Sequence, residues 1–328
     1  MKVLLFGGAG YIGTHVALAF LKHGDQVGIY DNLSSGLRSN VPDEAEFFEG
    51  DILDRKRVSE VLSKGWDAAV HLAAFKAAGE SMIKPEKYSE NNITGSLIII
   101  TECVKHGCMN FILSSSAATY GEPKYLPIDE KHPTNPENYY GYTKLAIEEN
   151  LRWYSKLRGL NYAALRYFNA AGYDVNGEMT GLERNPANLL PVIMEVAIGA
   201  RKELCIFGTD YDTPDGTCIR DYVHVSDLAD AHVMATEYIS KNKENLVVNL
   251  GSENGISVKE MVEAARRITG KEIPAKNSPR RAGDPAKLVA SSTLAHEKLG
   301  WSATKSDVET LIASTWNVYL KNKDYFKK

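Results

Sequence analysis

The sequence predicts an α/β protein in which a doubly wound parallel sheet is followed by a smaller C-terminal α/β domain. Strand-like and helix-like segments alternate through the first half of the chain, which is typical of a parallel sheet with helices on both faces. The first strand-like run also ends in a glycine-rich turn that leads directly into a helical segment. Ligands of such sheets bind beyond the carboxyl ends of the strands, so chemistry is expected there.

The predicted elements follow in a regular order in the first half. Strands are expected at 2–6, 26–30, 45–48, 67–71, 110–114 and 161–166, and helices near 11–23, 54–64, 86–106 and 139–158. From about residue 176 the alternation weakens, with strand-like runs at 204–207 and 247–250 and helices near 192–200 and 226–239. We therefore expect one domain over 1–175, to which segments around 217–250 return, and a second, mainly substrate-binding domain over 176–328.

Local signals mark some element ends in the second half. Ser226 is a suitable N-cap for the helix over 226–239, and Asp227 would lie in its first turn. Ser257 is followed three residues later by Glu260, which predicts a capping box. The lysine-containing end of the chain, 321–328, is expected to be a frayed tail.

The glycines of the first turn lie at positions suited to a dinucleotide. Gly7 would permit the tight turn, Gly10 would let the backbone approach a pyrophosphate, and Gly13 would let the helix pack against the strand. The phosphates would then face free N–H groups at a helix N-terminus. The alternative is a tight turn that holds no ligand.

An acidic residue at the end of the second strand favours NAD. Asp31 lies eighteen residues after Gly13, where a carboxylate can accept hydrogen bonds from a ribose diol and would repel the 2′-phosphate of NADP. Alternatively, Asp31 is an ordinary loop carboxylate at the start of a turn that ends at Gly36.

Further polar groups follow the next strands. Asp51 could hold the amino group of an adenine, with Ile52 against the ring, or Asp51 could simply N-cap the helix that begins near residue 53. Lys76 follows the fourth strand and could reach a phosphate or ribose. The serines at 114–116 follow the fifth strand and place hydrogen-bonding groups at the cleft, or else belong to a polar loop.

A Tyr-x-x-x-Lys pair opens the helix over 139–158. Tyr140 and Lys144 are four residues apart and therefore share a helix face. A cation beside a phenol favours the phenolate, so Tyr140 could act as a general base near neutral pH. An exposed Tyr/Lys pair without a catalytic role would have the same spacing.

Composition excludes several classes of protein. The chain has 328 residues and a net charge of −4, so no basic nucleic-acid surface is indicated. It has no apolar run long enough for a membrane span and no signal-peptide pattern, so we expect a cytoplasmic protein. The four cysteines show no C-x-x-C spacing, and no metal site is expected.

Considered together, the glycine pattern, the serine after the fifth strand and the Tyr-x-x-x-Lys pair resemble the extended short-chain dehydrogenase/reductase superfamily, which has a Rossmann-type fold. Within it the chain resembles the UDP-glucose 4-epimerase family over nearly its whole length. The motifs that carry this resemblance are Gly7-Gly-Ala-Gly-Tyr-Ile-Gly13, Lys76-Ala-Ala-Gly-Glu-Ser81, Asn91-Asn92, Ser114-Ser-Ser-Ala117, Arg166-Tyr-Phe-Asn-Ala-Ala-Gly172, Ile206-Phe-Gly208, Asp215-Gly-Thr-Cys-Ile-Arg-Asp-Tyr-Val-His224 and Pro279-Arg-Arg-Ala-Gly-Asp284.

The resemblance implies roles for the matching positions. Tyr140 would be the catalytic base, Lys144 its partner on the nicotinamide ribose, and Ser116 the group that hydrogen-bonds the reacting sugar oxygen. The implied cofactor contacts are Gly7, Gly10, Tyr11, Ile12, Gly13, Asp31, Asn32, Asp51, Ile52, Phe75, Lys76, Asn92, Ser114, Tyr140, Lys144, Tyr167 and Phe168. The implied substrate contacts are Lys76, Ser116, Tyr140, Asn169, Asn188, Leu189, Ile206, Phe207, Arg220, Tyr222, Arg281 and Asp284.

The implied reaction is reversible epimerisation at C4 of a UDP-hexose through a 4-keto intermediate, with bound NAD as transient hydride acceptor, as in galactose metabolism. A sugar-nucleotide 4,6-dehydratase is disfavoured, because Ala117 and Ala118 stand where those enzymes carry an acidic pair. Leu288 lies at the position that resembles the family's gate beside the sugar 2-substituent; we favour UDP-galactose and UDP-glucose, with N-acetylated sugars also open.

Two alternatives stay open at this point: another sugar-nucleotide epimerase, such as one acting on UDP-uronates, and a non-catalytic dinucleotide sensor. The Tyr140/Lys144 pair argues against the sensor. The resemblance also implies a homodimer formed through the helix that carries Tyr140 and the helix before it.

Overall fold

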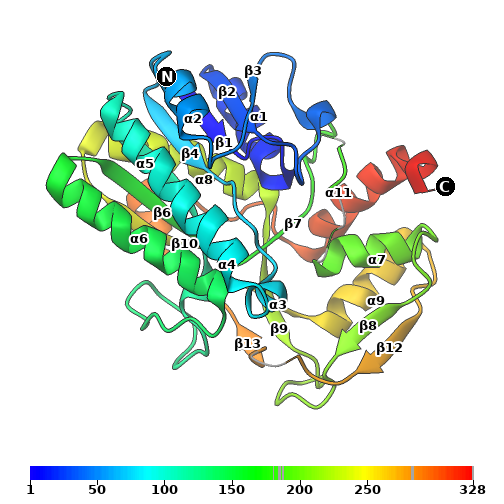
Figure 1. The fold of residues 1–328 in the computed structure, drawn as a ribbon. Coiled ribbons are helices and arrows are strands. Elements are labelled where there is room, and N and C mark those ends of the chain that lie inside the picture. The colour runs from blue at the N-terminus through cyan, green and yellow to red at the C-terminus, as the bar shows by residue number, and fades with distance from the viewer. Residues whose placement is uncertain (180, 184–185, 187, 282–283, 327–328) are drawn as a thin grey trace.

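The computed structural model describes the chain from residue 1 to 326 apart from 180, 184–185, 187 and 282–283 (Figure 1). Its larger part is a seven-stranded parallel sheet in the order β10-β6-β5-β4-β1-β2-β3. The strands are β1 (Lys2–Phe6), β2 (Gln26–Asp31), β3 (Glu46–Glu49), β4 (Ala68–His71), β5 (Asn110–Ser116), β6 (Asn161–Tyr167) and β10 (Leu246–Leu250). The predicted doubly wound α/β sheet is confirmed.

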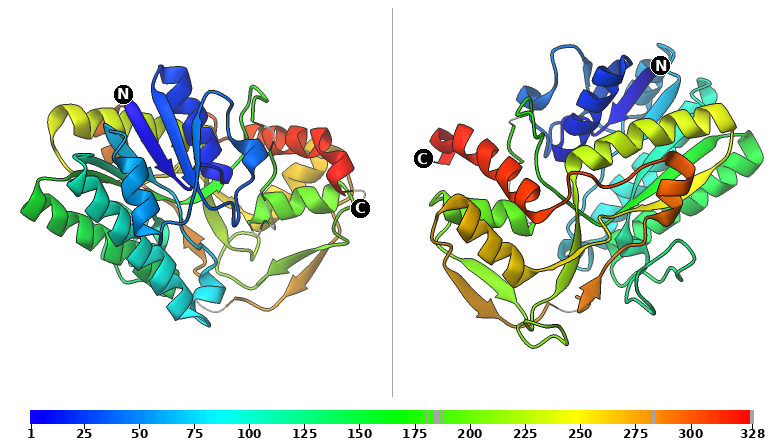
Figure 2. Two further views of the ribbon diagram at one scale, coloured as in Figure 1. Left: turned by 45° about the horizontal axis from the view of Figure 1, so that its top comes forward. Right: turned by 180° about the vertical axis from the view of Figure 1, so that it is seen from behind.

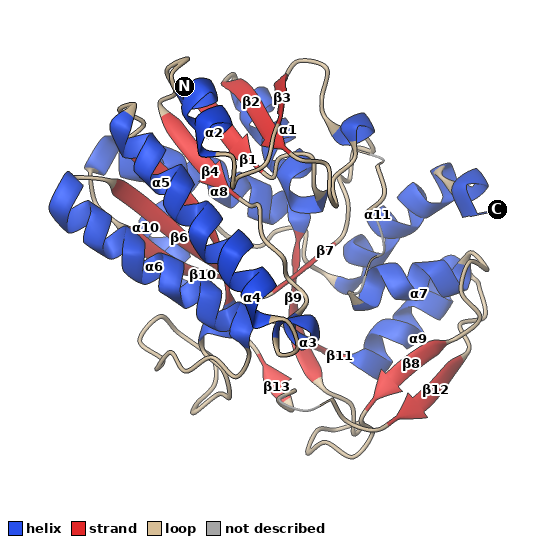
Figure 3. Ribbon diagram, viewed as in Figure 1, coloured by secondary structure: helices blue, strands red, loops and turns tan. Residues whose placement is uncertain are grey.

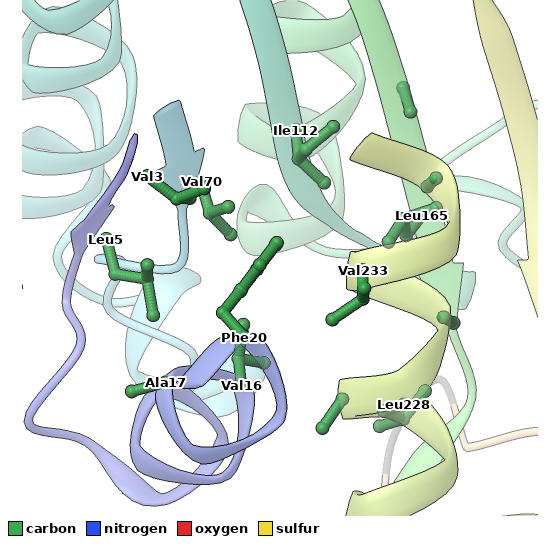
Figure 4. Packing of buried hydrophobic residues seen from close by; sticks show 14 of the residues in the cluster. Val3, Leu5, Val16, Ala17, Phe20, Val70, Ile112, Leu165, Leu228 and Val233 are labelled. Carbon is green, nitrogen blue, oxygen red and sulfur yellow. The ribbon is translucent and has the colours of Figure 1, made fainter. Parts of the chain in front are cut away.

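Two layers of helices cover the sheet because its strands are apolar on both faces. Val3 and Leu5 of β1 point toward α1 (Tyr11–His23) and α8 (Val225–Asn242), as Figure 4 shows. Leu4 and Phe6 point the other way, into a core formed with α2 (Arg55–Leu62), α5 (Gly95–Lys105) and α6 (Tyr139–Arg158). Seen from behind, α8 crosses in front of the sheet (Figure 2).

A smaller lobe follows, with its own core and two short sheets (Figure 3). In one sheet the central strand β9 (Ile219–His224) pairs with β7 (Asn169–Ala171), β11 (Gly255–Ser257) and β13 (Lys287–Leu288). In the other, β8 (Leu204–Phe207) pairs with β12 (Ala275–Ser278). Helices α7 (Leu189–Ala197), α9 (Val258–Thr269) and α11 (Val308–Lys321) pack in this lobe, and α10 (Thr293–Leu299) packs against α8.

The stretch 217–250 is shared between the lobes. Helix α8 packs against α1, and β10 pairs with β6, so both belong to the large sheet. Strand β9 belongs instead to the small lobe, where it pairs with β7. Since β7 follows directly after β6, this pairing joins the two lobes at the carboxyl edge of the large sheet.

Several local expectations differ from the structure. The helix expected over 86–106 is divided into α4 (Pro85–Tyr88), a π-helical turn over Ser89–Thr94 and α5. Ser226 is not the N-cap of α8: His224 is, and its Nδ1 accepts the N–H of Ser226. This prediction was wrong because the helix begins one residue before Ser226, which leaves that hydroxyl within the first turn.

Two further expectations concern a cap and the chain end. Asp54, not Asp51, caps α2, because its side chain accepts the N–H of Arg57. The capping box of Ser257 and Glu260 is confirmed. The tail is helical to Lys321, and Phe326 stacks on Tyr319 at 5.3 Å between ring centroids, so 321–326 is not frayed; 327–328 lie outside the described residues. No helix in the described part of the chain is long and apolar enough to cross a membrane.

Candidate active site

The glycine-rich turn between β1 and α1 leaves room for a ligand at one glycine only. A Cβ on Gly7 would lie 2.6 Å from the Ala73 nitrogen, and one on Gly13 would lie 2.4 Å from the Gly7 oxygen. A Cβ on Gly10 would meet only the Gly7 oxygen, at 3.5 Å. Gly10 is also the N-cap of α1 and makes no side-chain cap bond. This open helix N-terminus fits the diphosphate of a dinucleotide.

The side chains of Tyr11 and Ile12, the first two residues of α1, both pack away from this turn. The phenol of Tyr11 turns away from the turn, donates to the Gly172 carbonyl and packs against Tyr173, and burial raises its pKa well above the ordinary value. Only the backbone of Tyr11 therefore remains at the helix N-terminus. Ile12 packs on the main core cluster.

Asp31 is tied to the glycine turn by its carboxylate. Its Oδ2 accepts the Ala9 N–H at 3.0 Å and its Oδ1 accepts the Leu33 N–H at 2.8 Å. Burial raises the pKa of Asp31, while these two hydrogen bonds oppose that shift. Each oxygen keeps a lone pair for a further donor, so the residue can still hold a ribose diol.

Asn32 and Asp51 form the next contact along the strand ends. The Asn32 amide donates to Asp51 Oδ2 at 2.8 Å, and Asp51 Oδ1 accepts the Leu53 N–H at 2.9 Å. Asp51 is thus oriented by its neighbours and keeps acceptor capacity for an adenine amino group. The side chain of Ile52 lies in the core, where a Cβ on Gly95 would be 2.5 Å from its Cδ1.

The segment after β4 is clamped by a buried asparagine. Asn92 Oδ1 accepts the Phe75 N–H at 2.9 Å, and its amide donates to the Phe75 carbonyl and to Thr143 Oγ1 on α6. Asn92 therefore fixes this segment against α6. Lys76 forms an ion pair with Glu183 from the second half of the chain, a partner that no sequence motif indicated.

Strand β5 and helix α6 bring the Ser, Tyr and Lys together. Asn138 caps α6 by accepting the Gly141 N–H at 2.9 Å, so Tyr140 lies in the first turn. Ser116 lies beside the Tyr140 side chain, where it opposes the rise in the pKa of that phenol. Lys144 Nζ donates to the Ser114 carbonyl at 2.6 Å and lies 5.9 Å from the centroid of the Tyr140 ring.

The pKa values of Tyr140 and Lys144 differ from what the spacing of the two residues predicted. Burial raises the pKa of Tyr140, and the neighbouring Ser116 side chain only partly opposes this rise, so Lys144 does not produce the expected net lowering. Burial also lowers the pKa of Lys144 to about 8, against the opposing charge of Glu148. The site therefore holds a neutral phenol beside a lysine that can change its charge near neutral pH.

A cavity of about 530 Å³ in the small lobe collects most of the remaining predicted residues. The predicted residues that line it are Asn169, Asn188, Leu189, Phe207, Arg220, Tyr222, Arg281 and Asp284. Arg220 forms an ion pair with Asp284, and the Arg281 guanidinium lies 4.0 Å from the centroid of the Phe207 ring. Two guanidinium groups suit a diphosphate.

Other residues occupy places that the sequence did not indicate. The cavity is also lined by Pro186, Arg201, Glu203, Cys205 and Val258, which belong to none of the motifs described above. Ile206 packs against the core of the small lobe instead. The Tyr167 hydroxyl lies 2.7 Å from His232 Nε2. Phe168 and Leu288 each pack against a small cluster around Tyr120.

Comparison with known proteins gives consistent results. Residues 3–251 match the model of the NAD dependent epimerase/dehydratase family. A UDP-glucose 4-epimerase of Halalkalibacterium halodurans is 45% identical over 97% of this chain and 95% of its own length. The crystal structure of UDP-glucose 4-epimerase from Brucella ovis in complex with NAD superposes with a TM-score of 0.94 at 45% identity, over 96% of this chain and 97% of that one. The enzyme from Bifidobacterium longum, in complex with NAD+ and UDP, has a TM-score of 0.93 at 37% identity, over 98% and 99%.

Proposed function

Because this chain belongs to the NAD dependent epimerase/dehydratase family, we propose that it interconverts UDP-galactose and UDP-glucose by inverting C4 of the hexose through a 4-keto intermediate. The observation that carries the proposal is the joint placement of Ser116, Tyr140 and Lys144 at one end of the sheet that also presents the glycine turn. A reaction of this kind belongs to galactose metabolism.

The cofactor is NAD, which the turn and the neighbouring strand ends fit. The open N-terminus of α1 would receive the diphosphate, and Asp31 would receive the adenosine ribose. When bound, NAD supplies the redox chemistry by accepting the C4 hydride and returning it. Because no net oxidation occurs, the chain should retain its cofactor between turnovers.

The chain's own residues supply the proton transfer and the positioning. In its phenolate form, which the positive charges of Lys144 and of bound NAD+ would favour, Tyr140 takes the proton of the 4-hydroxyl and later returns it, and Ser116 orients the oxygen that loses it. Arg220 and Arg281 hold the diphosphate in the small lobe. Because these anchors act on the nucleotide and not on the hexose, the sugar can present either face to the hydride.

A direct assay tests the proposal. Purified protein incubated with UDP-galactose and no added NAD is expected to form UDP-glucose, because the cofactor is regenerated in each cycle. The products are separated by anion-exchange chromatography, and heat-denatured protein is the control. A requirement for stoichiometric NAD, with NADH accumulating, would instead indicate a dehydrogenase.

The same assay separates the remaining substrate classes. UDP-N-acetylgalactosamine tests the space at Leu288, which packs against the cluster of Ala117, Tyr120 and Ile128. UDP-glucuronate tests the uronate alternative. We expect UDP-galactose to be converted much faster than UDP-N-acetylgalactosamine or UDP-glucuronate. For the N-acetylated sugar the reason is that Leu288 is larger than the small residues that admit an N-acetyl group.

We also propose that the chain forms a homodimer through α6 and the neighbouring helix α5. Tyr142, Trp153 and Leu157 lie along one side of α6 and are 49%, 52% and 64% exposed. Exposed aromatic and aliphatic side chains at helical spacing are typical of a helix that packs against a partner.

The four free cysteines are in keeping with a cytoplasmic protein, and we propose the cytoplasm as the location of this chain.

Replacing Trp153 with Asp is expected to produce monomers at micromolar concentration, because a buried aromatic anchor contributes about 2 kcal/mol or more to an interface. Sedimentation velocity measures the change. Val175→Asp is the control, since Val175 is 46% exposed and follows Asp174, whose N–H donates to His15 of α1 on the other face of the sheet from α6. A Trp153→Asp variant that sediments like the unmodified protein would exclude this face as the interface.

A further inference from the structure

Three consecutive serines at the end of β5 contact three consecutive turns of α6. Ser116 lies beside Tyr140, and the carbonyl of the serine two positions earlier accepts from Lys144. The hydroxyl of Ser115 donates to Oε1 of Glu148, one turn beyond Lys144. The end of β5 thus meets α6 at residues 140, 144 and 148, which are one helical turn apart. Only the first two contacts involve residues assigned to the reaction.

The third contact ends in a buried ion pair. Arg166 of β6 donates to Glu148 from Nε at 3.0 Å and from Nη2 at 2.6 Å, and both side chains are less than a tenth exposed. Arg166 Nη1 also donates to the Tyr120 hydroxyl at 2.9 Å, which donates to Asn249 Oδ1 at 2.7 Å. Every charged group here has partners on other elements, so Glu148 is held from β5 and β6 together.

Stability gives little reason to keep such a pair. Burying two charges costs several kcal/mol of desolvation, and apolar residues of similar volume often stabilise a fold as well or better. The pair does, however, fix the position of Ser115 and hence of the strand end that carries Ser116. A misplacement of about 1 Å at a reacting group can lower a rate a hundredfold.

We propose that Glu148, held by Arg166, is a positioning residue for the Tyr140/Ser116 pair and for Lys144. This inference rests on the proposed epimerase function. Glu148 touches neither the sugar nor the cofactor; it acts through the serines of β5 and through Lys144.

The charges around the pair set the direction of the pH effect. Lys144 faces His71 of β4 and Glu148 of its own helix, and burial holds His71 neutral by lowering its pKa to about 3. Tyr140 is approached by the neutral phenols of Tyr88 and Tyr167. Glu148 raises the pKa of Lys144, so removing its charge should let Lys144 lose its proton at lower pH. The alkaline limb of kcat should then move to lower pH.

The experiment compares Ser115→Ala, Glu148→Gln and the unmodified enzyme. Both variants are expected to lower kcat about tenfold while the KM for UDP-galactose and the NAD content stay within twofold, since neither residue contacts a ligand. Glu148→Gln should in addition move the alkaline limb of kcat to lower pH. Glu149→Gln is the matched control, because Glu149 is the next residue along α6 but is 52% exposed and pairs with Arg152 at the surface.

Each outcome decides between positioning and a purely structural role. An unchanged kcat in Ser115→Ala would overturn the inference, as would an unchanged alkaline limb of kcat in a folded Glu148→Gln variant. A loss of NAD and a rise in KM that parallel the loss of kcat would overturn it too. If Glu148→Gln leaves Arg166 unpaired and does not fold, Ser115→Ala decides by the same criteria, because it removes one hydroxyl and no charge. Failure of the unmodified enzyme to convert UDP-galactose would instead reject the proposed function.

Discussion

Replacing Tyr140 with Phe is expected to lower kcat about a thousandfold while UDP-sugar still binds. The substitution removes only the phenolic oxygen, which is the group that we propose exchanges a proton with the 4-hydroxyl, and general acid–base catalysis of this kind contributes about 10² to 10⁴ in rate. The ring remains in place at the start of α6, and Arg220 and Arg281 of the small lobe are untouched. Initial rates with UDP-galactose give kcat, and calorimetric titration with UDP gives the affinity.

The neighbouring Tyr139 provides the control for this substitution. Its hydroxyl lies 2.6 Å from that of Ser89, away from Ser116, so Tyr139→Phe should keep kcat within about threefold. A Tyr140→Phe variant with near-normal turnover would mean that another group moves the proton, and the assignment of Tyr140 as base would have to be abandoned.

Alanine substitutions at Gly10 and Gly13 are expected to separate cofactor binding from folding. A Cβ on Gly13 would lie 2.4 Å from the Gly7 oxygen and 2.7 Å from the Gly8 Cα, so backbone must shift. Gly13→Ala should therefore lower the free energy of unfolding by about 2 to 3 kcal/mol and lose NAD. Gly10 has φ −80 and ψ 174 and open space for a Cβ, so Gly10→Ala should fold normally.

The new methyl group of Gly10→Ala would occupy the approach of the diphosphate to the helix N-terminus, and NAD affinity should fall about tenfold or more. Denaturant unfolding and the NAD released per chain measure the two effects. Full NAD content in purified Gly10→Ala would show that the phosphates lie elsewhere. Unchanged stability of Gly13→Ala would contradict the packing of α1 against the turn.

The sequence by itself predicted most of the fold, because its signals are local. A parallel strand buried on both faces is a short apolar run, and a helix on such a sheet is an amphipathic segment; both are visible without tertiary structure. The same holds for Gly13 and for the capping box at Ser257. Helix starts such as that of α8 were less predictable, since a buried histidine, His224, provided the cap in place of the nearby serine.

The proposed catalytic pair was also predicted from the sequence, since Tyr140 and Lys144 are four residues apart on a helix and therefore share a face. Only the tertiary structure decided the electrostatics of this pair. Burial raises the pKa of Tyr140, and Lys144 donates to the Ser114 carbonyl of β5; neither fact follows from the spacing of the two residues. Likewise, Arg166 and Glu148 are 18 residues apart, and Lys76 and Glu183 are 107 apart. Such pairs leave no local pattern, because the contact exists only once strands and helices from distant parts of the chain have packed together.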